Sequence, residues 1–135
     1  MEDRYLFKAK RIDNGEWVQG ALFNGESHCI IGQEIKFSPY NEHECKIVGY
    51  EVDRDTICQC TSLKDKNGKL IWENEIIKCK FGIAVAVWDK SEWRIKWVED
   101  NIWRKDLHYW VVEDNQRTEV IGNIFDNPEL LESEE

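Results

Sequence analysis

The chain has 135 residues, of which 41% are hydrophobic and seven are Trp, so it is long enough to bury the core of one domain. Its formal net charge at pH 7 is −9. An acidic chain disfavours nonspecific binding to nucleic acid, whose phosphates need a basic surface, and it suits a basic partner. No apolar run is long enough for a signal peptide or a membrane span, so we expect a cytoplasmic protein that does not enter a membrane. Five Cys in such a compartment favour reduced thiols over a disulfide framework.

Residues 1–62 predict an N-terminal β region built from hairpins. Two β-forming runs, residues 5–10 and 17–23, flank the pair Asn14-Gly15, which is the strongest short hairpin signal in a sequence. Further strands are expected at residues 28–31, 45–52 and 57–61, with a single helical turn at residues 53–56. Between residues 32 and 44 the pattern weakens and predicts an irregular loop.

The turn sequence Asp65-Lys66-Asn67-Gly68 divides the chain. Asp hydrogen-bonds its own downstream backbone, and Gly adopts a left-handed conformation at no steric cost. Because β-forming residues flank this turn on both sides, we interpret it as a hairpin reversal between a first and a second β region.

Residues 63–127 have the short strands and tight turns of an SH3-like small β-barrel, which makes the expected fold mainly β. Strands are predicted at residues 75–80, 83–88, 93–97, 111–112 and 119–125. The run 93–97 alternates apolar and basic residues, as a strand with one solvated face does. Asn127 followed by Pro128 predicts the start of a short helix, and residues 128–135 form this helix and an acidic tail.

Three parts of the chain resemble the YopX family of phage and prophage proteins. They are LFKAKR with DNGEWVQG (residues 6–11 and 13–20), QCTSLKDKNGK with ENEIIK (59–69 and 73–78), and EVIGNIFDNPELL (119–131). The resemblance implies a phage-encoded accessory protein with a β-rich fold that includes an SH3-like barrel, and it offers no catalytic residues to transfer. Where the family pattern usually has Gly, this chain has Ser62 and Asn74, which we expect to reach the same turn conformations. Residues 25–50 and 93–110 are not matched.

His43 and Cys45, together with Cys58 and Cys60, form a candidate metal site. Residues two apart share one face of a strand, so each pair could present two ligands to a tetrahedral zinc ion if the two strands were neighbours. The alternative is that Cys58 and Cys60 are small, inward-facing core residues just before the turn. Structural zinc loops also usually place two or more residues between paired ligands, which favours the core interpretation.

The sequence carries no sign of catalysis. Nucleophilic catalysis needs a thiol or hydroxyl with a base in reach, yet the chain has three His and neither a nucleophile elbow nor a phosphate-binding loop. Asp65 and Glu75 could be paired carboxylates, but turn formation and solvation at a strand edge account for them. We therefore expect a protein that is not an enzyme and needs no cofactor.

Five Trp of the second region, at positions 88, 93, 97, 103 and 110, are interleaved with basic residues. A small barrel needs bulky filling, so some of these rings belong to the core. Five exceed what a small barrel encloses, and surface Trp is enriched where partners bind. The candidate binding residues are Trp93, Arg94, Trp97, Trp103, Arg104 and Trp110, with Trp103 and Trp110 expected at the surface.

These observations favour a macromolecular binding module. We expect the partner to be a protein, either a host factor or a second copy of the chain, with modulation of host or defence machinery as the role. The first alternative is an accessory protein that binds nucleic acid through the same Trp and Arg residues, with bases stacked on the indoles. The second is a zinc-stabilised structural module.

Overall fold

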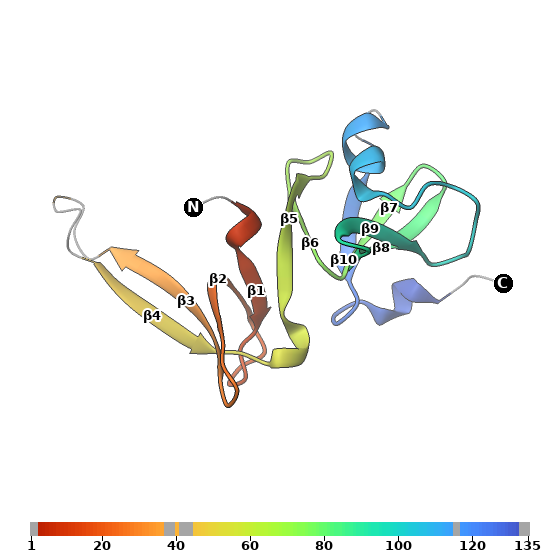
Figure 1. Ribbon diagram of the computed structural model, residues 1–135. Helices are drawn as coiled ribbons and strands as arrows, with labels where there is room; N and C mark the ends of the chain where they lie inside the picture. The colour runs from red at the N-terminus through yellow and green to blue at the C-terminus, as the bar shows by residue number, and fades with distance from the viewer. Residues whose placement is uncertain (1–2, 37–39, 41–44, 115–116, 133–135) are drawn as a thin grey trace. The chain divides into compact units, whose positions relative to one another are not determined.

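The computed structural model describes residues 3–36, 40, 45–114 and 117–132, and it confirms a mainly β protein (Figure 1). The chain divides into two compact units, Met1–Gln59 and Cys60–Glu135. The division falls within strand β5 (Cys58–Lys64), the strand in which the sequence analysis placed it after residue 62. Within the described part of the chain, no helix has the length and apolar character that crossing a membrane requires.

The first unit is an antiparallel sheet in the order β4-β3-β2-β1-β5. Its strands are β1 (Phe7–Lys10), β2 (Trp17–Asn24), β3 (Cys29–Lys36), β4 (Cys45–Glu51) and the start of β5, with short 3-10 helices η1 (Asp3–Tyr5) and η2 (Arg54–Thr56). The predicted hairpin around Asn14-Gly15 is confirmed, with Gly15 at a φ of 73°. The predicted helical turn is also confirmed, because the Asp53 side chain caps η2 by accepting from the Asp55 amide.

The loop predicted from residue 32 is wrong for its first five residues. Residues 32–36 continue β3 and pair with β4 from Gly32 opposite Gly49 to Lys36 opposite Cys45. Pairing with a neighbouring strand supplies the hydrogen bonds, so it overrides the weak local propensity of this stretch. The rest of the expected loop, apart from Tyr40, lies outside the described residues.

The core of the first unit is small. Its buried members are Ala9, Cys29, Ile31 and Val52, and Phe7, Val18, Leu22 and Ile57 pack against them. These side chains come from five different strands or loops, so this core forms only when the sheet does.

The second unit contains the end of β5 paired with β6 (Leu70–Trp72) and a four-stranded antiparallel sheet in the order β10-β7-β8-β9. The four strands are β7 (Glu75–Cys79), β8 (Gly82–Asp89), β9 (Glu92–Trp97) and β10 (Glu119–Asn123). Two short helical segments follow β9 and β10, the π-helix η3 (Tyr109–Glu113) and the 3-10 helix η4 (Pro128–Leu131).

The strands of the second unit, as far as the structure describes them, do not close into the expected barrel. β9 and β10 are the outer strands of their sheet, and the strand predicted at Val111-Val112 is helical instead. Leu107, Trp110 and Val111 are all buried at helical spacing, which explains why this segment coils onto the core rather than adding a strand.

Asn127 occupies the predicted N-cap position of η4, but its side chain makes no capping hydrogen bond to this helix. Its side-chain oxygen accepts a hydrogen bond from the Asn123 amide, 3.2 Å away, and thereby holds the end of β10. Pro128 stands in the first turn of η4, as predicted.

Two residues expected to reach a left-handed turn conformation do so. Ser62 and Asn74 both have a φ of 67°. Asn74 is held by its amide, which donates to the Ala86 carbonyl, and by its carbonyl, which accepts from the Ile124 amide. The prediction that both residues reach the left-handed region is therefore confirmed.

The turn after β5 anchors the second unit. Asp65 is 7% exposed, and its Oδ1 accepts from the amides of Asn67 and Lys69 at 2.9 and 3.0 Å. Its Oδ2 accepts from the Val120 amide on β10 at 3.0 Å. One carboxylate therefore forms the predicted turn and also ties it to a strand that is distant in sequence.

Candidate binding surface

The indoles of the second unit divide into enclosed and exposed groups. Trp72, Trp97 and Trp110 are buried and Trp93 is half-buried, whereas Trp88 is 54% and Trp103 43% exposed. The prediction that some Trp lie at the surface is confirmed, and it holds for Trp103. It is wrong for Trp110, which is 1% exposed.

Trp110 is the centre of an aromatic cluster. The rings of Phe81, Trp97 and Tyr109 each meet its ring edge to face, with centroids 5.8, 5.4 and 5.0 Å away. Its Nε1 donates to the Arg104 carbonyl at 2.8 Å, and its own carbonyl accepts from the Thr118 hydroxyl at 2.7 Å. Trp110 therefore supports the surface from beneath instead of contacting a partner.

Phe81 and Trp103 form a stacked pair at the surface, which we call the aromatic platform. Their centroids are 4.0 Å apart and their planes differ by 5°. The Asn101 side chain fixes the approach of Trp103 by accepting from its amide at 2.9 Å. Phe81 is 41% exposed, so the platform offers two flat apolar rings that are already oriented by the cluster beneath.

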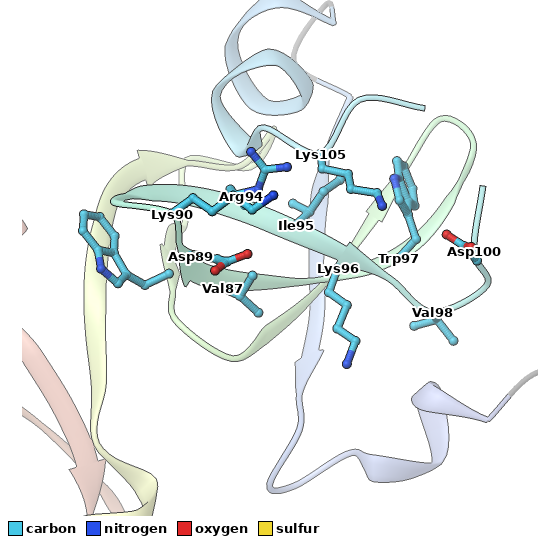
Figure 2. Close-up of a pocket in the computed structure, with 11 residues that line it drawn as sticks. Val87, Asp89, Lys90, Arg94, Ile95, Lys96, Trp97, Val98, Asp100 and Lys105 are labelled. Atoms are coloured by element: carbon cyan, nitrogen blue, oxygen red, sulfur yellow. The ribbon is translucent and has the colours of Figure 1, made fainter. Parts of the chain in front are cut away.

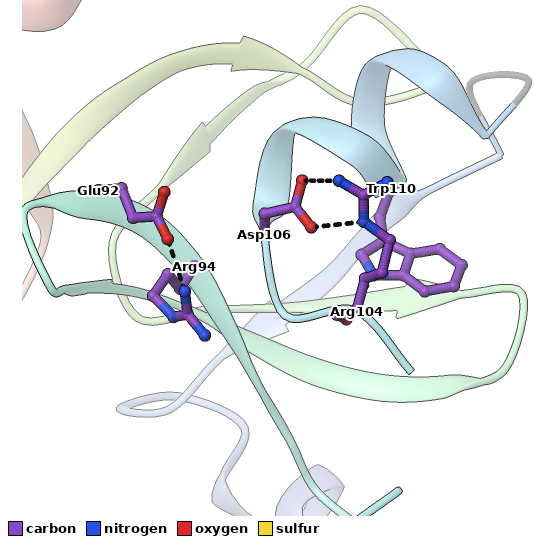
Figure 3. Close-up of polar contacts among 5 residues, drawn as sticks. All are labelled: Glu92, Arg94, Arg104, Asp106 and Trp110. Carbon is purple, nitrogen blue, oxygen red and sulfur yellow. Dashed lines mark hydrogen bonds and ion pairs between the residues drawn. The ribbon is translucent and has the colours of Figure 1, made fainter. Parts of the chain in front are cut away.

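The two predicted Arg residues are paired with nearby carboxylates, as Figure 3 shows. Arg94 donates to Glu92, and Arg104 makes a two-pronged pair with Asp106 at 2.9 and 3.0 Å. Arg104 also lies over the Tyr109 ring, 4.3 Å from its centroid. Both guanidiniums therefore stabilise local structure, and the combined Trp and Arg face predicted from the sequence has less unpaired charge than expected.

The Arg104–Asp106 pair shifts both acid–base equilibria. The hydrogen bonds that Arg104 donates to Asp106 raise the pKa of Arg104. Burial alone would raise the pKa of Asp106, but the hydrogen bonds from Arg104 and from backbone amides outweigh it, so the pKa of Asp106 is lowered. Both groups are therefore charged at neutral pH. Their ion pair holds the chain directly after Trp103 in place.

The predicted site residues occupy two places. Trp97 and Arg104 contact Trp110, and Trp103 and Trp110 contact Phe81, so these four residues belong to one cluster. Trp93 and Arg94 lie at the other end of β9, where Trp93 pairs with Trp88 across the β8–β9 hairpin and their rings meet edge to face at 5.1 Å. The sequence order alone could not separate these groups, because all six residues lie within positions 93–110.

A groove of about 440 Å³ borders the platform. Phe81, Trp97 and Leu130 give it apolar walls, and four carboxylate side chains line it: Glu99, Asp100, Glu129 and Glu132. We call it the acidic groove. Its composition suits a basic side chain that enters with its aliphatic stem against the rings.

Phe81 and Glu129 of η4 were not among the site residues expected from the sequence. Residues 81–82 were only the connection between two predicted strands. A large aromatic residue at a turn, where small polar residues are usual, was the available signal. Glu129 carried no signal, because it reaches the groove only through the path of the chain after β10.

The metal candidates do not meet the geometry that the zinc hypothesis requires. Cys45 is exposed on β4, and β3, β2 and β1 lie between β4 and the strand that carries Cys58. Cys58 and Cys60 are both buried, as the core interpretation predicts, and His43 lies outside the described residues. In the part of the chain that the structure covers, no group of three or more His, Cys, Asp or Glu is placed to hold a metal ion.

Asp65 and Glu75 have separate structural roles. Glu75 is 3% exposed, so the expected solvation at a strand edge is wrong for it. Its Oε1 accepts from the Trp72 amide at 2.7 Å and so closes the β6–β7 turn. Both carboxylates hold turns through backbone amides, which accounts for their burial without catalytic chemistry.

Comparison with known proteins supports the sequence resemblance. The chain matches the family described as YopX protein over residues 6–132, nearly its whole length. None of the curated proteins matches the chain.

Proposed function

Because the chain belongs to the YopX family, for which we have no catalytic residues to transfer, we propose that it is a noncatalytic binding module whose partner is a protein. The setting that we propose is a phage or prophage protein in the cytoplasm of a bacterial host. Its role there is to modulate host or defence machinery by occupying a surface of the partner.

The aromatic platform is the observation that supports this proposal. Phe81 and Trp103 expose two stacked rings, whereas Trp97 and Trp110 are enclosed beneath them. Aromatic residues that are rigid before binding lose little conformational freedom in a complex and dominate the binding energy of many interfaces. A partner that covers both rings gains the burial of apolar surface that the isolated chain leaves in water.

The acidic groove indicates the chemistry of the partner. Four carboxylates line it beside Phe81, in a chain whose net charge is −9. We therefore propose that the partner presents an apolar residue to the platform and a Lys or Arg to the groove. The opposite charges would speed association and orient the encounter.

Selection of displayed random peptides on the immobilised full-length chain tests this proposal. We expect selected peptides to combine an aromatic or aliphatic residue with Lys or Arg. Trp103→Ala should weaken the binding of a selected peptide at least about tenfold, the loss expected for an anchor residue. Glu129→Gln should weaken it less and should reduce its dependence on salt.

Trp88→Ala is the matched control, because it removes an exposed indole that lies outside the platform. Circular dichroism of each variant establishes that the fold is intact. Acidic consensus peptides, or equal binding by the Trp103→Ala and Trp88→Ala variants, would contradict the proposal. If sedimentation shows a dimer of the chain that Trp103→Ala dissociates, the protein partner is a second copy.

A further inference from the structure

A second groove, of about 600 Å³, lies along the β8–β9 hairpin and differs from the acidic groove in charge (Figure 2). Its lining includes Lys90, Arg94, Lys96 and Lys105, with Asp89 and Asp100 as the acidic members. Counting Glu92, the partner of Arg94, the local balance is four cations against three anions, or +1, in a chain of net charge −9. We call it the basic groove.

Backbone pairing positions one of the cations of this groove. The Ile95 amide donates to the Lys105 carbonyl at 2.8 Å, which places Lys105 beside the edge strand β9. Figure 2 shows Arg94 and Lys105 on one side of β9 and Lys96 on the other. Among the residues that the structure describes, Lys90, Lys96 and Lys105 form no ion pair. Their charge is therefore available to a ligand.

Trp97 adds a donor without a partner. Its side chain is 6% exposed, and its Nε1 is a buried nitrogen with no hydrogen-bond partner among the described residues. Figure 2 shows this nitrogen on the side of the indole that faces Lys105. An unpaired buried donor is unfavourable. A ligand rich in acceptor oxygens would satisfy this nitrogen after a small side-chain shift, as is common at binding sites.

The hairpin turn that supplies Lys90 is strained. Lys90 and Ser91 have φ values of 52° and 62°, which is the conformation that Asn-Gly adopts most easily. Left-handed residues with full side chains are uncommon and concentrate at functional sites. This turn contributes Lys90 to the lining of the basic groove, at a position where Asn would fit the turn better.

Trp88 provides a flat apolar surface in the same groove. It lines the groove, is 54% exposed and is braced edge to face by Trp93. Proteins that hold nucleotides combine cations, which bind the phosphate, with an exposed aromatic ring, on which any base can stack. We propose that the basic groove binds a nucleoside phosphate unit, with its phosphate at Arg94 and Lys105 and its base on Trp88.

This unit can be a free nucleotide or part of a single strand, and two probes distinguish these sources. Thymidine monophosphate and an oligothymidylate of about eight nucleotides would be titrated against the full-length chain at low salt, with quenching of Trp fluorescence as the readout. Binding of the oligonucleotide at least about tenfold tighter than the mononucleotide identifies a single strand as the ligand, and equal affinity identifies a free nucleotide.

The variants test the assignment of residues. Trp88→Ala should weaken the binding of the tighter probe about tenfold and remove most of the quenching. Lys105→Gln should weaken oligonucleotide binding and lower the slope of log affinity against log salt by about 0.7, the loss of one phosphate contact. Trp103→Ala should leave both probes unaffected, which separates this site from the proposed protein-binding platform.

Two results would overturn the proposal. One is the absence of binding of either probe at low salt. The other is binding that neither Trp88→Ala nor Lys105→Gln changes. Trp88 and Lys105 both lie at the surface, so we expect neither substitution to unfold the chain. An unchanged circular dichroism spectrum shows that a variant has lost binding without losing its fold.

Discussion

Asp65→Asn tests the claim that one carboxylate holds the second unit together. Asn has nearly the shape of Asp but only one acceptor oxygen. If that oxygen keeps its bonds to the Asn67 and Lys69 amides, the Asn nitrogen faces the Val120 amide, and two donors oppose each other. The variant loses a charge-assisted hydrogen bond at a site that is 7% exposed, so we expect a loss of about 1.5–3 kcal/mol in the free energy of unfolding.

The effect should depend on pH. Burial favours the neutral form of Asp65, but the amides of Val120, Lys69 and Asn67 and the charge of Lys69 outweigh it, so the pKa of Asp65 is lowered. A carboxylate with a lower pKa in the folded than in the unfolded state adds stability above the unfolded pKa of about 3.9. This contribution disappears as the pH falls through the folded pKa. The wild type and the variant should therefore differ fully at neutral pH and converge in acid.

Urea unfolding followed by Trp fluorescence is the appropriate assay, because six of the seven Trp belong to the second unit. Asp55→Asn, an exposed substitution in η2 of the first unit, is the matched control and should not change the transition. An Asp65→Asn variant with wild-type stability, or a stability difference that stays constant into acid, would refute the assigned role of Asp65.

Three further predictions concern individual residues. Ser91→Gly should stabilise the chain by about 1 kcal/mol in urea unfolding, because Gly relieves the left-handed strain at that position; a loss of stability would contradict this account of the turn. Gly20→Ala should lower the free energy of unfolding by about 1–3 kcal/mol in thermal unfolding, because the new Cβ would lie only 2.2 Å from the Gly32 oxygen. Gly32→Ala is the control: its Cβ would make only ordinary contacts, so it should change the stability little. A thiol reagent should modify Cys45 quickly and the four buried Cys only on unfolding. Burial raises the pKa of the Cys79 thiol to about 11, which further slows its reaction. Rapid reaction of more than one thiol in the folded chain would show that the cores open.

Local signals predicted those parts of the fold that local chemistry determines. Asn14-Gly15 specifies the hairpin between β1 and β2, and Asp65 with Gly68 specifies the reversal between β5 and β6, because turn conformations depend on the turn residues themselves. The alternation of residues 93–97 likewise identified β9 and its buried face. Ser62 and Asn74 have the left-handed conformation that the resemblance to the family led us to expect at both turns.

The remaining errors concern features that tertiary contacts decide. Residues 32–36 form a strand because β4 lies beside them, which their own sequence does not encode. Val111 lies in a helical segment because it and Trp110 share a buried face with Leu107, although two adjacent Val favour a strand in isolation. The exposed half of the aromatic cluster depends on Phe81, whose position follows from the path of β7 and β8.

Site-specific photocrosslinking in the bacterial host tests the central claim most directly, because it reports contacts of the platform under the conditions in which the protein acts. A benzophenone amino acid would replace Trp103 in one variant and Trp88 in another. We predict that the variant at position 103 becomes covalently joined to a protein, either a host protein or a second copy, and that the variant at position 88 does not. Absence of a protein adduct at position 103, or the same adducts from both positions, would contradict the claim that the stacked rings of Phe81 and Trp103 form a protein-binding surface.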